Sequence, residues 1–326
     1  MPLLTSQVHV DEALSNISVA FAQEQTRFIA DKVFPSIPSP KLTDKYFVFD
    51  RGNYLRSIAD LRATGSETKG ANYTLSTDTF SCDQYGVHMD LDDYVVGNAD
   101  AALNIEVSTT QYITEQLLLK REQVFAAAAF TTSVWTGSTG GGDITVGSGA
   151  NQITAWDTSP STPIKDIKEQ IDSVESKTGR RPNVLLLGKD TYTALATNAD
   201  LIERVKYTQT GMLTPDLMAA LFGVDRVHVP GAIVNTANQG ATDSLSFVFG
   251  SNDAALYYVP PTAGLMTPSA GYMFNFTGVE GGNASGLRVL NYRIDHKHSQ
   301  RIEALSAFDF KVVSSDLGVF FSNCVS

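Results

Sequence analysis

The sequence lacks the features that mark several classes of protein. It has two cysteines in 326 residues, and neither belongs to a C-x-x-C pair or a Cys/His cluster, which argues against a disulfide framework or a structural zinc site. No apolar run reaches about 18 residues, so no transmembrane helix is predicted. The N-terminus shows no basic segment followed by an apolar one, so no signal peptide is predicted. These absences favour a protein made and used in a cytoplasm.

Basic charge is also scarce. The chain carries 35 acidic residues against 24 lysines and arginines, a net charge of −11. Broad binding to nucleic-acid phosphates needs a basic face, and this balance argues against it. The charge is compatible with a protein that coexists with nucleic acid without adhering to it.

Catalytic motifs are missing as well. The sequence contains no G-x-x-x-x-G-K-S/T loop, no G-x-S-x-G elbow and no dinucleotide fingerprint after a strand. Nothing near Asp92 and Asp93 marks either carboxylate as a tuned acid or base. His296 and His298 would share one face of a strand, but no third ligand is nearby, so a polar pair beside a turn is the favoured interpretation. We therefore predict no catalytic, cofactor or metal site, and no enzyme.

What the chain does contain is a long helical stretch, residues 98–131, without proline or glycine. Asn98 is the predicted N-cap. The spacing predicts one helix of roughly 30 residues, about 45 Å long. Glu106, Gln111, Glu115 and Glu122 lie off its predicted apolar stripe, which consists of Leu103, Val107, Ile113, Leu117, Val124 and Ala128.

The segments before this helix have little core of their own. Residues 1–45 are predicted to form an arm. Within it, the amphipathic stretch 11–25 is compatible with a helix, and the chain around Pro35, Pro38 and Pro40 is expected to be extended. Residues 46–93 predict a long β-hairpin with a charged tip at 59–71. A two-stranded ribbon is marginal alone, so it lies on the parent domain or reaches another subunit. Apolar arm residues that need cover are Phe28, Ile29, Val33, Phe34 and Ile37.

The segments after the helix alternate in type. Six glycines between Gly137 and Gly149 predict a flexible connector. Residues 156–261 predict an α/β block with helices at 162–179, 189–207 and 214–223. Pro163 is expected at the first position of the first helix and Gly179 at its C-cap, and Thr214 is the predicted cap of the third helix. A buried strand is predicted at 182–188, with further strands at 225–235 and 244–260. From residue 262, an antiparallel set of strands is predicted at 272–279, 286–313 and 317–325, with a turn near His298 and Ser299. This sheet is expected to pack on the apolar stripe of the long helix.

The order of arm, long hairpin, long helix, α/β block and long strands resembles the major capsid proteins of tailed bacteriophages, with the Hong Kong 97-type fold. Residues 30–56, 98–122 and 162–188 carry the likeness most clearly. The resemblance implies an α+β fold. Its expected parts are an N-terminal arm (1–45), an extended β-hairpin loop (46–90), a spine helix of the peripheral domain (91–136), an axial α/β domain (137–261) and the long strands of a peripheral β-sheet domain (262–326).

The resemblance also implies a function. Copies would assemble as pentamers and hexamers into an icosahedral virion capsid, built in the host bacterial cytoplasm, that encloses double-stranded DNA without sequence-specific binding. No membrane and no cofactor are implied. Expected partners are a portal protein, a separate scaffolding protein, because the arm begins close to Met1, and in some relatives a cement or decoration protein. Charges near the predicted domain edges are candidate intersubunit contacts: Arg51, Arg56, Arg62, Glu67, Lys69, Lys168, Glu169, Arg301 and Glu303.

Three alternatives stay open at this point. An encapsulin-like compartment shares the fold but holds cargo enzymes; the proline-bearing arm and residues 30–56 favour the phage interpretation. A cytoplasmic α/β enzyme with a β accessory domain would need a cleft with convergent polar groups, and the sequence shows no such set. A tail-tube or adhesin protein would be β-rich and would lack the long helix.

Overall fold

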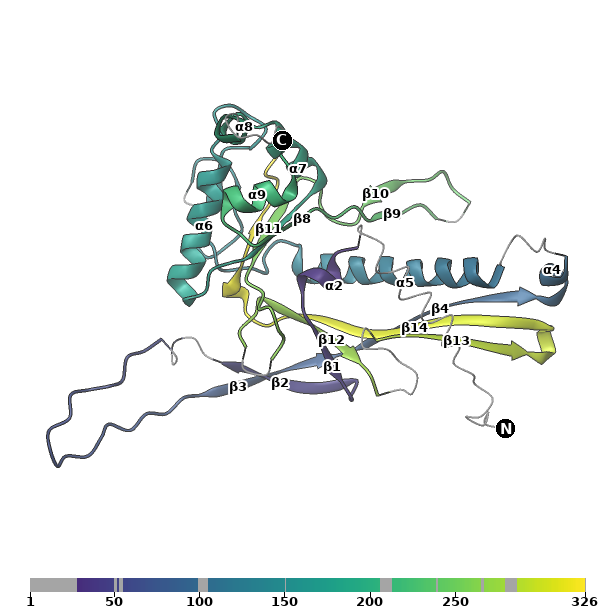
Figure 1. Ribbon diagram of the computed structural model, residues 1–326, viewed down its shortest axis with the longest axis horizontal. Helices are drawn as coiled ribbons and strands as arrows, with labels where there is room; N and C mark the ends of the chain where they lie inside the picture. Colours follow the sequence, from purple (N-terminus) through teal and green to yellow (C-terminus); the bar gives the residue numbers. More distant parts are fainter. Residues whose placement is uncertain are drawn as a thin grey trace.

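The structure is a computed structural model that describes residues 28–49, 52, 55–98, 105–149, 151–205, 213–238, 240–264, 267–278 and 286–325. The molecule is elongated (Figure 1). One long helix runs parallel to a set of long strands, a block of shorter helices covers one end, and a thin ribbon extends beyond the body. None of the helices in the described ranges is long and apolar enough to cross a membrane.

A five-stranded sheet forms the long axis of the molecule. The strands are β1 (Ser36–Ser39), β12 (Gly271–Phe276), β14 (Ser299–Val312), β13 (Leu287–Ile294) and β4 (Asp83–Asp92). The central strand is β14, where Ile302 pairs with Asn291 of β13 on one side and with Met89 of β4 on the other. All pairings are antiparallel except that of β1 with β12. Burial alternates along β14, as expected for a strand with one face on a core.

The spine helix α5 (Ile105–Ala129) packs on this sheet, where Ile113 and Leu117 belong to one buried cluster with Ile302 of β14. This confirms the predicted partner of the long helix. Asn98 does not cap it: Asn98 has a helical backbone and ends a short helix, α4 (Asp93–Gly97). Residues 99–104, including the expected stripe residue Leu103, lie outside the described residues.

The buried face of α5 is more polar than its predicted stripe. Val124 and Ala128 are only half-buried, whereas Thr110 and Thr114 are fully buried. These threonines fit because each hydroxyl donates to the carbonyl four residues earlier, as Thr114 does to Thr110 O at 2.7 Å. Periodicity alone selects apolar residues and therefore missed them.

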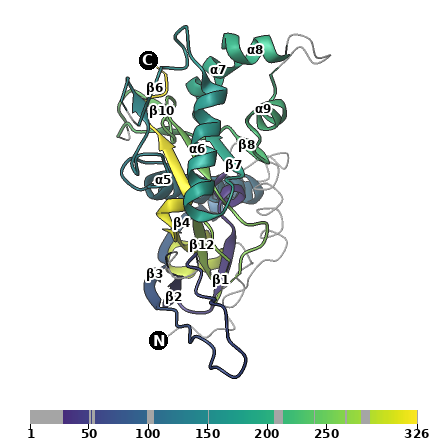
Figure 2. The same ribbon diagram turned by 90° about the vertical axis from the view of Figure 1, so that its left-hand side faces the viewer.

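A second sheet lies inside the helical block. Its strand order is β15 (Gly318–Phe321), β11 (Ala254–Tyr257), β7 (Val184–Leu187), β8 (Arg226–His228). Figure 2 shows the helices around it: α6 (Pro163–Thr178), α7 (Lys189–Thr197), α8 (Ala199–Val205) and α9 (Pro215–Phe222). Pro163 opens α6 and Gly179 follows its end with φ 69°, both as predicted. The predicted helix 189–207 is interrupted at Asn198, which has an extended backbone and donates to Trp156 O at 2.8 Å.

Two predictions about this end of the molecule were wrong. The last strand, β15, does not join the long strands, because the chain turns at η3 (Ser315–Leu317) and β15 pairs with β11. The glycine-rich segment is packed rather than free. Ile144 is buried and bridges to Phe321, and a Cβ on Gly137 would lie 2.5 Å from Gly318 O. The segment also contains two short paired strands, β5 (Thr145–Val146) and β6 (Gln152–Ile153).

Candidate assembly surfaces

The thin ribbon of Figure 1 consists of β2 (Thr43–Phe49) and β3 (Leu75–Ser81), paired antiparallel. It confirms the first part of the predicted hairpin. The second part, β4, pairs with β14 instead. Apolar side chains on the ribbon and its loop face solvent: Leu61 is fully exposed, and Leu55 and Tyr73 are 59% and 60% exposed. These side chains are available for contact with a neighbouring chain.

The charged tip of the ribbon loop is held by contacts within the tip. Lys69 Nζ lies 2.6 Å from Asp60 Oδ2, and Arg62 Nε donates to Ser66 O at 2.5 Å. An exposed ion pair contributes at most about 1 kcal/mol, so a partner on a neighbour could replace it at little cost. Arg56 and Glu67 are exposed. Arg51 lies outside the described residues.

The root of the ribbon is fixed to the long sheet. The ring of Phe80 stacks on Phe274 of β12 with centroids 4.2 Å apart, and Tyr46 lies 5.6 Å from the same ring. The amide of Ser81 donates to Asp309 Oδ2 at 3.0 Å. The ribbon is therefore anchored at its base, while its loop extends away from the other helices and strands of the described residues (Figure 1).

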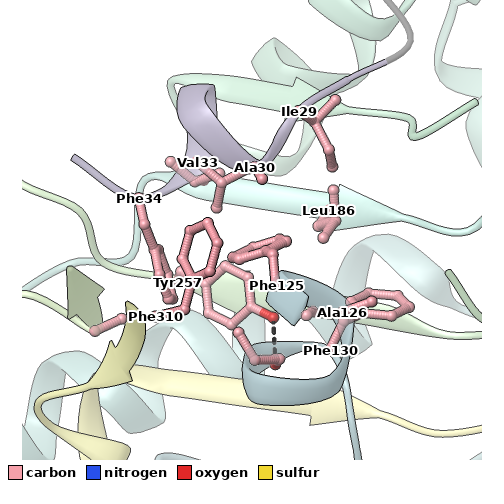
Figure 3. Packing of buried hydrophobic residues seen from close by; sticks show 14 of the residues in the cluster. Ile29, Ala30, Val33, Phe34, Phe125, Ala126, Phe130, Leu186, Tyr257 and Phe310 are labelled. Carbon is pink, nitrogen blue, oxygen red and sulfur yellow. Dashed lines mark hydrogen bonds between the residues drawn. The ribbon is translucent and has the colours of Figure 1, made fainter. Parts of the chain in front are cut away.

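The arm crosses the body at α2 (Ala30–Val33), one turn of helix within a segment predicted to be extended. Figure 3 shows its apolar residues against α5 and the second sheet. Phe34 makes edge-to-face contacts with Phe125 and Tyr257, at centroid distances of 5.1 and 5.7 Å. Burial raises the pKa of Tyr257, whose hydroxyl donates to Ala129 O at 2.8 Å. Ile29, Val33 and Phe34 were predicted to require burial, and they are buried against other residues of the same chain.

Two charged residues of α5 tether the arm. Glu122 Oε1 accepts hydrogen bonds from the amides of Ile29 and Ala30, each at 2.7 Å. Arg121 Nη1 lies 2.9 Å from Asp31 Oδ2. Glu122 is 1% exposed, so the prediction that it lies off the buried stripe was wrong. Its burial raises the pKa of its carboxyl to about 7. The available sequence signal was a run of four charged or polar residues, 120–123, between the apolar residues 117–119 and 124–130.

At the far end of the long sheet, an ion-pair cluster joins β4 to β14. Asp90 accepts from Arg301 Nε at 2.6 Å and from Lys297 Nζ at 3.0 Å. The hydrogen bond from Arg301 holds the pKa of the Asp90 carboxyl well below its usual value. Glu303 accepts from the Tyr292 hydroxyl at 2.9 Å. The contacts found for Arg301 and Glu303 thus lie within the chain and stabilise the sheet.

The same end exposes α4 and the turn between β13 and β14. Tyr94 and Val95 of α4 are 85% and 58% exposed, a second apolar patch. The predicted turn is confirmed, as η2 (Asp295–Lys297) followed by His298 with φ 47°. His296 and His298 therefore do not share a strand face. Across the described ranges, no three His, Cys, Asp or Glu residues are grouped to hold a metal ion.

A third projection, the hairpin of β9 (Ile233–Asn235) and β10 (Leu245–Phe247), extends beside α5 (Figure 1). Ile233, Leu245 and Phe247 are 45%, 70% and 40% exposed. The sequence predicted strands here but not their projection from the block. Lys168 and Glu169 lie elsewhere, exposed on α6, with Glu169 3.5 Å from Lys165. The predicted contact residues are thus spread over several surfaces rather than gathered in one site.

Comparisons with known proteins cover nearly the whole chain. It is 26% identical over 319 residues to the major capsid protein of Pseudomonas phage JBD67 (97% of each chain) and, at the same identity over 319 residues, to that of Burkholderia phage BcepMu (96% of each). No protein-family model matches. Both relatives are structural proteins.

Solved structures show the same fold. A phage-related protein from Bordetella bronchiseptica superposes with a TM-score of 0.72 at 22% identity, over 97% of this chain and 98% of that one. The mature capsid of bacteriophage PhiM1 gives 0.55 at 10% identity (89% and 84%). An encapsulin from Synechococcus elongatus gives 0.53 at 10% identity (90% and 86%).

Proposed function

We infer from these findings that the chain is a major capsid protein of the tailed-phage type, with a Hong Kong 97-like fold and a structural function in the virion capsid. We propose further that it assembles as pentamers and hexamers into an icosahedral shell around the phage's double-stranded DNA. Assembly would take place in the cytoplasm of the host bacterium.

The ribbon carries this proposal. A two-stranded ribbon with few buried residues is at best marginally stable in water, yet here it holds apolar side chains such as Leu61 in solvent. Such a segment is expected where a neighbouring copy supplies the missing contacts. The exposed residues of α4 and of the β9–β10 hairpin extend the same argument to other sides of the molecule. A subunit with apolar projections in several directions suits a closed lattice better than a single dimer contact.

The net charge of −11 supports a wall that encloses DNA without binding it tightly. Expected further partners are a portal protein, a separate scaffolding protein and, in some shells, a cement or decoration protein. We propose that residues 1–45 act as the arm, 46–90 as the extended loop, 91–136 as the spine, 137–261 as the axial domain and 262–326 as the strands of the peripheral domain.

The candidate intersubunit contacts divide into two groups. Arg56, Arg62, Glu67 and Lys69 lie on the exposed loop, and Lys168 and Glu169 on the outer side of α6, where a neighbour can reach them. All of these intersubunit contacts remain predictions. For Arg301 and Glu303, the intramolecular partners favour a role within the sheet.

The likeness to an encapsulin supports one other candidate function, a compartment that holds cargo proteins. The higher TM-score of the phage-related protein and the two capsid relatives favour the phage function.

The deciding experiment is electron microscopy of the purified protein together with its mass in solution. Closed shells would support the capsid proposal, and their contents would separate a phage shell, filled with DNA in infected cells, from a cargo compartment. Rings of five or six subunits would indicate capsomers that need a scaffold. A monomer that persists at high concentration, even with a scaffolding protein, would contradict the proposal.

A further inference from the structure

A groove of about 620 Å³ lies between the β9–β10 hairpin, the outer side of α5 and the strand β4. Its walls are mainly apolar, with amide and charged side chains along α5. The residues that matter below are Phe28, Tyr85, Leu119, Gln123, Ile233 and Leu245.

The β9–β10 hairpin forms one wall of this groove and is too short to be stable by itself. β9 and β10 have three residues each, and a hairpin of this length is not stable alone in water. Ile233 and Leu245 line the groove and are still 45% and 70% exposed. An apolar occupant would remove these side chains from water, with a gain of about 25 cal/mol for each Å² buried.

The chain itself leads into the groove. Phe28, the first described residue, is one of its lining residues. The next two residues, Ile29 and Ala30, are fixed by the hydrogen bonds to Glu122. The described part of the chain therefore begins at this groove. Their stretch 11–25 places Leu14, Ile17 and Phe21 at spacings of three and four, one face of a helix about 22 Å long. Only residues 26 and 27 separate that stretch from Phe28.

We propose that residues 11–25 of the same chain dock in this groove as an amphipathic helix, with Leu14, Ile17 and Phe21 against α5 and the β9–β10 hairpin. The docked segment would supply the apolar support that the hairpin lacks. It would couple the start of the arm to a projection of the helical block, which the sequence places more than 200 residues away.

Hydrogen exchange of the full chain tests this docking in subunits kept below the concentration at which shells form, so that failure to build a shell does not affect the result. Amides of residues 11–25 and of the hairpin 231–248 are expected to be protected in the wild-type chain. Phe21→Asp should accelerate exchange in the hairpin by about tenfold or more, because it breaks the docked apolar face. Gln23→Asp, on the opposite side of the predicted helix, is the matched control and should leave the hairpin unchanged.

A second substitution, on the hairpin side of the groove, separates loss of docking from misfolding. Leu245 is mostly exposed, so Leu245→Asp should preserve the fold while it accelerates exchange in residues 11–25; Ser246→Asp, on the other face of β10, should not. Equal exchange in Phe21→Asp, Leu245→Asp and wild-type chains would overturn the proposal. Protection that rises with protein concentration would also overturn it, because the occupant would then belong to a second copy.

Discussion

The buried carboxyl of Glu122 makes the attachment of the arm dependent on pH. Burial raises its pKa from 4.5 to about 7, against the opposing effect of the amides of Ala30 and Ile29. Asp31 raises the pKa further and Arg121 lowers it. Glu122 Oε2 is buried and has no hydrogen-bond partner among the described residues. Below about pH 7 the folded chain therefore favours the protonated form, which keeps Oε1 as the acceptor for both amides.

The sign of the effect follows from proton binding. Between pH 4.5 and about 7 the folded chain holds a proton on Glu122 that the unfolded chain has lost. The stabilisation is complete below pH 4.5 and is lost as the pH rises through about 7. At roughly 1.4 kcal/mol per pKa unit, the difference between the pKa of Glu122 in the unfolded and in the folded chain corresponds to about 3 kcal/mol in the free energy of unfolding.

The substitution that isolates this effect is Glu122→Gln, which keeps an oxygen acceptor and removes the ionisation. Urea unfolding of unassembled subunits, followed by the fluorescence of the buried Trp135 and Trp156, gives the free energy at each pH. Relative to Glu122→Gln, the wild-type chain should lose about 3 kcal/mol between pH 4.5 and pH 8. Glu115→Gln, exposed on the same helix, is the control and should follow the wild type. If the free energy of unfolding changed with pH in the same way for the wild type and for Glu122→Gln, the reasoning would be refuted.

Three further substitutions test the other contacts. Leu61→Asp should abolish shell formation yet change the unfolding free energy by less than about 0.5 kcal/mol, because Leu61 is fully exposed. Normal shells from this variant would contradict the prediction, and Ala63→Asp is the control for the added charge alone. Phe80→Ala removes the stacking on Phe274, whose ring centroid is 4.2 Å away, and should lower the free energy of unfolding by about 3–5 kcal/mol. Proteolysis at residues 43–81 should become faster. An unchanged cleavage rate would count against this contact as the anchor of the ribbon. Gly318→Ala places a Cβ against the Trp135 ring and should cost about 1–3 kcal/mol by urea unfolding, whereas Gly70→Ala, with open space around it, should cost nothing.

Local signals in the sequence predicted many elements correctly. Pro163 and Gly179 bound α6, and Thr214 caps α9 through its hydroxyl, because proline, left-handed glycine and a capping side chain act within one turn. The break at Asn198 was missed, and the predicted N-cap at Asn98 was wrong, because Asn98 ends α4. At Asn198 the end of the helix is accompanied by a hydrogen bond to a partner distant in the chain, Trp156 O, which no local pattern indicates.

The surfaces were harder to predict than the elements. Exposed charges such as Lys69 and Glu169 could be named from the sequence, but their present partners, Asp60 and Lys165, lie within the same loop or helix turn. The arm tether was missed entirely. Its donor amides and its carboxyl are more than 90 residues apart, and no local pattern links them.

By itself the sequence determined the order of the elements and the presence and partner of the spine helix, because these follow from composition, periodicity and short-range signals. The order of the elements also carried the resemblance to phage capsid proteins. Only the tertiary structure decided that β15 joins the second sheet, that the glycine-rich segment is packed, and that Arg121 and Glu122 face the arm. Those outcomes depend on which distant segments meet. A buried charge or a close glycine is stable only when a particular partner is already in place.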